Sequence, residues 1–131
     1  MAGTFEIVFD GGALGNPGKG YGSYRIAGPD GVVAHDRLDY GDGITNNQAE
    51  YRTLIAALER LAQHVGPDAP ATTVAVRGDS NLVVNQVLGR WKVKHPDLQP
   101  LHRRAVGLLR AFGRSDVQWH RRDASVRVLG H

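Results

Sequence analysis

The stretch TNNQAEYRTLIAALERLAQHV, residues 45–65, decides the fold of this 131-residue chain, because it is a long segment with one clear period. Polar residues open it at Thr45, and Gly66 followed by Pro67 closes it, as is usual at the ends of helices. Glu50 lies four residues before Leu54, so we expect it on the helix stripe that faces the sheet rather than the solvent. Apolar residues at intervals of three and four predict an amphipathic helix: Tyr51, Leu54, Ile55, Leu58, Leu61 and Ala62.

Strand-like segments lie on both sides of this helix. Residues 4–9, 21–27 and 32–38 predict three antiparallel strands, joined by a glycine-rich loop and by the turn Gly28-Pro29-Asp30-Gly31. Two further strands, 73–76 and 117–120, and two further helices, 80–88 and 97–112, complete the order βββαβααβ. This order predicts an α/β fold with a mixed five-stranded sheet, three antiparallel strands then two parallel ones, flanked by helices. We predict a single domain over residues 1–131.

Composition limits the classes of function. Lys and Arg number 16 against 13 acidic residues, and 10 of those 16 follow Gly89, which suggests a polyanionic partner. The absence of cysteine excludes a disulfide framework and a thiolate zinc site. The sequence has neither a signal segment nor an apolar run of about 18 residues, so we expect a cytoplasmic protein with no membrane partner. Nothing in the sequence requires more than a monomer.

Three acidic residues lie next to the ends of predicted elements: Asp10 after the first strand, Glu50 near the start of the long helix, and Asp79 after the fourth strand. If the first and fourth strands are neighbours, all three carboxylates meet at one edge of the sheet. Buried unpaired carboxylates are unfavourable, and a hard divalent cation such as Mg²⁺ would compensate them. For any one acid alone the alternative is helix chemistry, with Asp79 or Ser80 as an N-cap and Glu50 as a first-turn acid.

Four motifs occur in a fixed order between residue 4 and about residue 122. They are Asp10-Gly11-Gly12 with Gly15-Asn16-Pro17-Gly18, then the segment from Thr45 to Tyr51, then Asp79-Ser80-Asn81-Leu82-Val83, then Gly89-Arg90-Trp91-Lys92-Val93-Lys94. Together they resemble type 1 ribonuclease H. The resemblance implies the ribonuclease H-like fold and an endonuclease that hydrolyses the RNA strand of RNA/DNA hybrids to 5′-phosphate and 3′-hydroxyl products. It also implies two Mg²⁺ ions, replaceable by Mn²⁺, with Asp10, Glu50 and Asp79 as metal ligands and catalytic residues.

The same resemblance implies a set of nucleic-acid contacts. Gly11 and Gly12 would let the backbone approach the RNA strand closely, and Thr45 would help to hold a phosphate of the DNA strand. Trp91 with Lys92 would form a stacking and phosphate-binding edge, unless Trp91 packs under the third helix. Longer family members insert a basic helix and loop here, a basic protrusion that this chain lacks. The remaining polar contacts, for which turn and cap chemistry is the alternative, are Asn16, Asn46, Asn47, Ser80 and Asn81.

The C-terminal segment departs from the family pattern, which has a fourth carboxylate near the start of a final helix. An ungapped match puts Leu129 at that position, and a shift of two residues puts Arg127 there. Three alternatives remain: Asp123 replaces the missing ligand, His120 or His131 assists, or catalysis is weak or lost. The last alternative would make the chain an RNA/DNA hybrid-binding module. We expect the final helix to be missing or very short.

Overall fold

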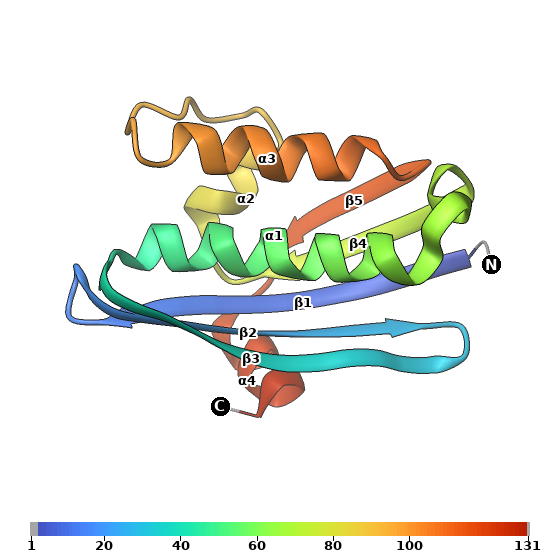
Figure 1. The fold of residues 1–131 in the computed structure, drawn as a ribbon, viewed down its shortest axis with the longest axis horizontal. Helices are drawn as coiled ribbons and strands as arrows, with labels where there is room; N and C mark the ends of the chain where they lie inside the picture. The colour runs from blue at the N-terminus through green and yellow to red at the C-terminus, as the bar shows by residue number, and fades with distance from the viewer. Residues whose placement is uncertain (1–2, 131) are drawn as a thin grey trace.

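The computed structural model describes residues 3–130, in which five strands form one sheet (Figure 1). Their order across the sheet is β3-β2-β1-β4-β5. The pairs β1–β2 and β2–β3 are antiparallel, and the pairs β1–β4 and β4–β5 are parallel, which confirms the predicted mixed sheet. The strands are β1 (Gly3–Leu14), β2 (Gly18–Gly28), β3 (Gly31–Ile44), β4 (Thr72–Gly78) and β5 (Arg114–Trp119).

Helices α1 (Asn46–Val65), α2 (Asn81–Val87) and α3 (Gln99–Arg110) lie on one side of the sheet, and α4 (Arg122–Leu129) lies on the other (Figure 1). The short 3₁₀ helix η1 (Gly66–Ala71) joins α1 to β4. A capping box at Thr45 begins α1, and Leu54, Leu58 and Leu61 on its apolar stripe are buried. The long helix is therefore confirmed almost to the residue. Within residues 3–130, no helix is long and apolar enough to cross a membrane.

The prediction that Asp10 ends the first strand is wrong. β1 continues to Leu14, and its last residues pair with β2, so the expected glycine-rich loop is largely a β-hairpin. β4 ends at Gly78, opposite Phe9, whereas Asp10 still pairs with Ser23 on the other side. Asp10 therefore lies where the central strand loses its parallel neighbour, inside the sheet rather than at its edge.

The final helix is present, and it is short, which confirms the second of the two expected alternatives and excludes a missing helix. Helix α4 has eight residues, and Gly130 ends it in the left-handed conformation, with φ 81°. Ser125 and Leu129, one turn apart, are each 1% exposed, and the helix packs on β1 and β2. A helix of this length is only marginally stable alone. Packing of these two side chains on the sheet therefore stabilises it.

Gly11 lets β1 approach α1 very closely. A Cβ atom on Gly11 would lie 2.6 Å from the carbonyl carbon and oxygen of Ala49 and 2.8 Å from the backbone nitrogen of Glu50. These are backbone atoms, which cannot rotate out of the way. Any side chain at residue 11 would therefore push α1, and Glu50 with it, away from the sheet.

We expect Gly11→Ala to lower the free energy of unfolding by about 2 kcal/mol, as is typical when a packed core must accept an extra methyl group. The matched control is Gly107→Ala, because Gly107 lies inside α3 and a Cβ there would meet no atom within 4 Å. That control should raise the free energy of unfolding by roughly 0.5–1 kcal/mol, since alanine favours helices. Urea unfolding of both variants measures these changes, and an unaltered Gly11→Ala midpoint would contradict the proposed constraint.

Candidate active site

Three acidic side chains from distant parts of the chain converge at the point where β4 ends. Asp10 comes from β1, Glu50 from α1, and Asp79 directly follows β4. One carboxylate oxygen of each lies within 4.8 Å of those of the other two. Asp10 is 4% exposed and Glu50 is 7% exposed, and the Asp79 side chain is also 7% exposed. The structure thus brings together the three acids that the sequence singled out.

The cluster holds more negative charge than its surroundings compensate. Burial raises the pKa of Glu50 well above its usual value, and the charges of Asp10 and Asp79 raise it further. The Gly11 N–H donates a hydrogen bond to the Glu50 carboxylate and opposes this rise. Burial, followed by the charge of Asp10, raises the pKa of Asp79 to about 6, whereas Arg122 acts to lower it. Repulsion among these carboxylates is the situation that a bound cation relieves.

The residues present fit a hard divalent cation. All three donors are carboxylate oxygens, the ligand type that Mg²⁺ prefers in proteins. Within the described part of the chain, Glu50 Oε2 and Asp79 Oδ2 are buried oxygens that accept no hydrogen bond. Across residues 3–130, no second group of three acids or histidines converges in this way. The cluster is therefore the candidate metal centre.

The structure does not bring Asp123 to this cluster, so the idea that it replaces the missing ligand needs correction. Its side chain is exposed, and its Oδ1 lies 3.7 Å from Nε of Arg121. Arg122 instead approaches the acids, with Nη1 3.6 Å from Asp79 Oδ2. Of the other residues considered for this position, Arg127 is exposed and Leu129 is buried.

Of the two histidines considered as helpers, His120 lies within the described residues and contacts helix α4. His120 donates its backbone N–H to the Gly78 carbonyl at 2.9 Å, and its Nε2 lies 2.6 Å from Ser125 Oγ. The pKa of His120 is lowered by burial and by the charge of Arg77. His120 thus joins β4 to α4, and His131 lies outside the described residues.

Comparisons with known proteins decide the family. A family model described as reverse transcriptase-like matches residues 10–128. Ribonuclease HI of Halobacterium salinarum is 42% identical over 110 residues, 84% of this chain and 53% of that protein. The solved N-terminal ribonuclease H domain of Rv2228c from Mycobacterium tuberculosis is 39% identical, with a TM-score of 0.85 over 96% of this chain and 88% of that one. This chain belongs to the type 1 ribonuclease H family.

Two further comparisons bear on this ribonuclease H family member. The whole bifunctional protein Rv2228c is 45% identical over 114 residues, which are 86% of this chain but 30% of that protein. The chain therefore spans less than two thirds of the curated relatives it matches. The structure of LC11-RNase H1 in complex with RNA/DNA hybrid has a TM-score of 0.85 and 31% identity, over 94% of this chain and 89% of that one.

Several residues that the ribonuclease H resemblance assigns to nucleic acid hold the start of α1 in place. The Thr45 hydroxyl accepts from the backbone of Gln48 at 3.1 Å. Asn16 Oδ1 accepts from the Asn46 N–H at 3.1 Å, and Asn46 Oδ1 accepts from the Ala13 N–H at 2.8 Å. These bonds join the β1–β2 hairpin to α1. A cavity of about 200 Å³ lies beside them, lined by Asn16, Thr45, Asn47, Gln48, His95, Asp97 and Leu98.

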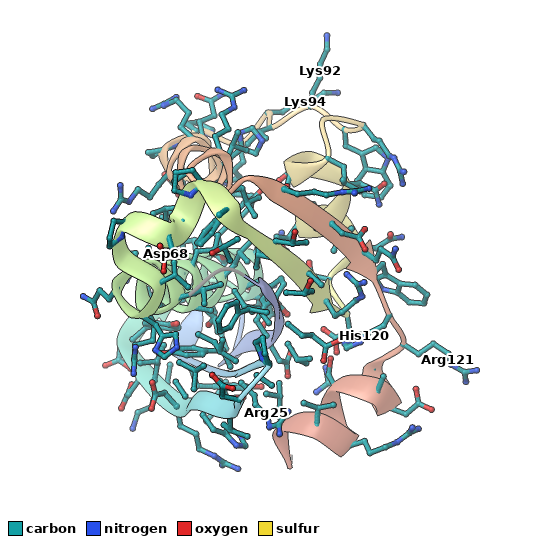
Figure 2. All side chains as sticks on the ribbon, turned by 90° about the vertical axis from the view of Figure 1, so that its right-hand side faces the viewer. Arg25, Asp68, Lys92, Lys94, His120 and Arg121 are labelled. Carbon is teal, nitrogen blue, oxygen red and sulfur yellow. The ribbon has the colours of Figure 1, made fainter. Side chains whose placement is uncertain are left out.

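The second group of expected contacts lies on and after α2. Ser80 caps α2 by accepting from the Val83 N–H at 3.2 Å, which is the cap chemistry considered for it, and Asn81 Oδ1 accepts from Asn85 Nδ2 at 2.8 Å. Trp91 is 47% exposed and lines a cavity with Gln99, His102 and Arg103 of α3, so it lies beside this helix and is not buried beneath it. Lys92 beside it extends into the solvent, as does Lys94 (Figure 2).

Gly12 faces Tyr21 on β2, because a Cβ there would lie 2.7 Å from the Tyr21 hydroxyl. Tyr21 is 37% exposed and its ring can turn away, so packing constrains residue 12 less than it constrains residue 11.

Sequence reasoning missed two residues that hold the site in place. Trp119 Nε1 donates to the Asp79 carbonyl at 3.0 Å and so fixes the backbone of one acid. Gln86 accepts from the buried Tyr51 hydroxyl at 2.7 Å and donates to the Lys92 carbonyl at 3.2 Å. It thereby links α1, next to Glu50, with the basic segment. A buried tyrosine predicts a partner for its hydroxyl, but the sequence does not say which residue supplies it.

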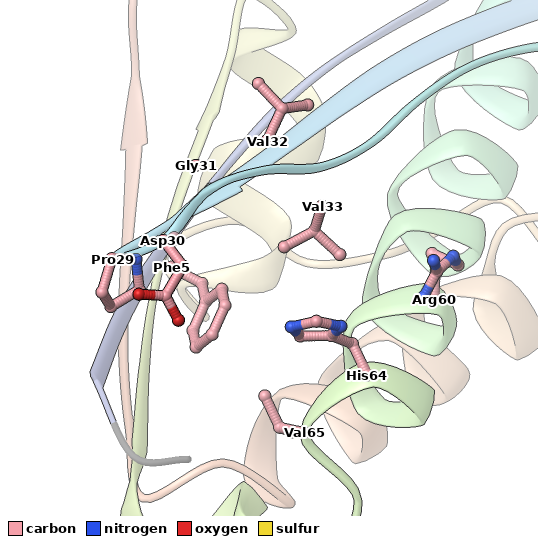
Figure 3. Close-up of a pocket in the computed structure, with 10 residues that line it drawn as sticks. Phe5, Pro29, Asp30, Gly31, Val32, Val33, Arg60, His64 and Val65 are labelled. Carbon is pink, nitrogen blue, oxygen red and sulfur yellow. The ribbon is translucent and has the colours of Figure 1, made fainter.

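A cavity of about 350 Å³ lies at the other end of the sheet and contains none of these acids (Figure 3). Phe5 and Val65 give it apolar walls, and Arg60 and His64 line it from α1. Because Asp10 and Glu50 are absent from its lining, this cavity is separate from the candidate metal centre.

The raised pKa of Asp79 predicts a dependence of stability on pH in metal-free buffer. A carboxyl with a raised pKa in the folded state favours folding at low pH and opposes it once ionised, so stability should fall from about pH 4 through about pH 6. Asp79→Asn removes this ionisation and should raise the free energy of unfolding at pH 7.5 by roughly 1 kcal/mol, with no gain at pH 4.

Urea unfolding in EDTA between pH 4 and pH 8 measures this difference. Asp123→Asn is the control, because Asp123 is exposed and lies outside the cluster. A constant difference between Asp79→Asn and the unaltered chain at every pH would contradict the assignment of this ionisation to Asp79.

Proposed function

We propose that this chain is a divalent-metal-dependent endoribonuclease that hydrolyses the RNA strand of RNA/DNA hybrids and leaves 5′-phosphate and 3′-hydroxyl ends. The observation that carries this proposal is the convergence of Asp10, Glu50 and Asp79 within 4.8 Å of one another. Membership of the ribonuclease H family supports the activity. The structure of LC11-RNase H1 with RNA/DNA hybrid supports the choice of substrate.

Asp10, Glu50 and Asp79 would hold Mg²⁺ or Mn²⁺, with two ions expected once substrate is bound. When bound, such ions activate a water molecule and stabilise charge on the leaving oxygen. The protein's own part is to orient the ligands before the ions arrive. The Gly11 N–H orients the Glu50 carboxylate, and Trp119 fixes the backbone of Asp79. Ligands held in this way need little rearrangement on binding, which favours both affinity and rate.

The surfaces on either side of the acids would hold the hybrid. The cavity beside Thr45, Asn16 and Asn47 would take a backbone phosphate of the DNA strand, and exposed Trp91 with Lys92 would contact the same strand further along. The RNA strand would lie nearest the acids, against the backbone and side-chain groups of Gly11, Gly12, Asn46, Ser80 and Asn81. Discrimination of RNA from DNA would depend on the 2′-hydroxyl and groove shape. We propose that residues 1–131 act as one such domain and as a monomer.

The second candidate function is a hybrid-binding module with weak or lost catalysis. One observation favours it: no carboxylate of residues 3–130 joins the three acids, and the group that approaches them from α4 is the Arg122 guanidinium. The two functions share a fold and a partner. Only turnover distinguishes them.

We expect Asp10→Asn to lower the rate of hybrid cleavage by more than roughly a hundredfold. Loss of a residue that only hydrogen-bonds to a metal ligand typically costs about 10- to 100-fold, and loss of the ligand itself should cost more. Binding of the hybrid should stay within about threefold, since the fold and the basic residues are kept. Cleavage of a labelled hybrid in Mg²⁺ or Mn²⁺, with EDTA as a further control, measures the first effect, and fluorescence anisotropy measures the second. Asp116→Asn, an exposed acid paired with Arg77, should retain full activity.

Binding without cleavage by the unaltered chain, in both metals, would overturn the enzyme proposal in favour of the binding module. Cleavage by Asp10→Asn at the normal rate would instead show that the three acids are not the active site.

We expect Trp91→Ala to raise KM for the hybrid roughly tenfold with little change in kcat, because stacking on an aromatic side chain contributes about 1–3 kcal/mol per base. Lys92→Ala should raise KM less and reduce the salt dependence of binding. Steady-state kinetics at two salt concentrations tests both variants. The control is Arg114→Ala, since Arg114 is an exposed basic residue at the start of β5. An equal rise in KM in this variant would show that positive charge in general, rather than contact at residues 91 and 92, causes the effect.

A further inference from the structure

Arg122 approaches the acid cluster from the solvent side. Its Nη1 lies 3.6 Å from Asp79 Oδ2, while its own side chain is 70% exposed and that of Asp79 is 7% exposed. Asp79 Oδ2 is also one of the two buried oxygens noted above that accept no hydrogen bond among the described residues. The guanidinium is therefore a positive charge placed next to an oxygen that is available to a metal ion.

The fold fixes the position of the Arg122 backbone. The backbone N–H of His120 bonds to the Gly78 carbonyl, directly before Asp79, and the His120 ring contacts Ser125 of α4 at 2.6 Å. Leu129 anchors the other end of α4 in the core. Arg122 is the first residue of this helix, so its Cα is held near the cluster while its side chain remains free to swing.

The neighbouring arginine behaves differently, although it has the same charge. The Nε of Arg121 lies 3.7 Å from Asp123 Oδ1, and the Arg121 side chain is 81% exposed. Figure 2 shows Arg121 pointing outward into the solvent. Arg121 and Arg122 thus form a natural pair of test and control positions, one residue apart at the start of the same helix.

We propose that Arg122 competes with divalent cations for Asp79 and so sets the affinity of the acid cluster for metal in the free protein. The inference rests on the proposed function, since it assumes that the three acids hold the metal. In the metal-free protein the guanidinium offsets part of the repulsion among the carboxylates. A divalent ion that binds the same carboxylate must displace this positive charge, because two cations at a few ångströms repel each other.

Loss of a residue that supports a metal site usually weakens metal binding, whereas loss of Arg122 should strengthen it. Arg122→Ala should tighten binding of Mn²⁺ roughly three- to fivefold, the upper part of the range expected for a partly exposed charge pair. Arg122→Glu should tighten it more than about tenfold, because a carboxylate replaces the competing cation. Arg122→Lys keeps the charge and should stay within about twofold of the unaltered chain. Arg121→Ala and Arg121→Glu should also stay within about twofold, although Arg121→Glu changes net charge as much as Arg122→Glu does.

The experiment is a titration of each purified chain with MnCl₂ without nucleic acid, at constant ionic strength, in which electron paramagnetic resonance reports free Mn²⁺. Thermal unfolding with and without Mn²⁺ is the second readout. The stabilisation by Mn²⁺ should be larger in Arg122→Ala than in the unaltered chain, and circular dichroism checks that each variant is folded. Neither readout depends on cleavage of a hybrid.

Equal Mn²⁺ affinities in Arg122→Ala and the unaltered chain would overturn the proposal, as would equal shifts at residues 121 and 122. Weaker binding in Arg122→Ala would show that Arg122 supports the site rather than competes for it. If no variant binds Mn²⁺, the acid cluster is not a metal site, and the proposed function fails with the inference. If the unaltered chain binds Mn²⁺ and the Arg122 variants match it, only the inference fails.

Discussion

The contact between Gly11 and the backbone of Ala49 and Glu50 is the constraint on which the rest of the site depends. A side chain on residue 11 would meet those backbone atoms at 2.6–2.8 Å, so only glycine lets the central strand touch the long helix there. That contact places Asp10 and Glu50 side by side and lets the Gly11 N–H donate to the Glu50 carboxylate. One missing Cβ thus connects the packing of the fold to the geometry of the acids.

The convergence that this contact enforces works against stability. Burial raises the pKa of Glu50 well above its usual value and that of Asp79 to about 6, so ionising both acids at neutral pH opposes folding. A protein can keep such a cluster only if the rest of the structure over-determines it. Here the backbone of Asp79 is fixed by Trp119, and Glu50 is carried on a helix whose apolar stripe is buried in the core. A divalent cation that binds the three carboxylates would offset their mutual repulsion and so stabilise the folded state.

The sequence predicted the elements that follow from the spacing of apolar residues. It missed the features that depend on contacts between residues far apart in the chain. The apolar spacing from Tyr51 to Ala62 determined α1, and the strand and helix order determined the sheet, so the approach of Asp10, Glu50 and Asp79 followed from topology alone. The extension of β1 beyond Asp10 was not visible, because GGALGNPGKG has little strand propensity and pairs only through its register with β2. The sequence left open whether the short helix α4 forms, because packing of Ser125 and Leu129 on the sheet stabilises it. The contact of Arg122 with Asp79 was likewise unpredictable, since it depends on where α4 begins.

Arg122 places a positive charge beside the three acids, on the side from which helix α4 approaches them. Three carboxylates fit one cation well, and a second cation beside a scissile phosphate needs further negative ligands. Residues 3–130 supply no further carboxylate there and supply a guanidinium instead. A guanidinium is permanently charged and presents several donors in a plane that matches phosphate oxygens. When a phosphate enters between Arg122 and the acids, it offers the arginine a new partner, so the charge that opposes a metal ion in the free protein would favour the ion once substrate is bound.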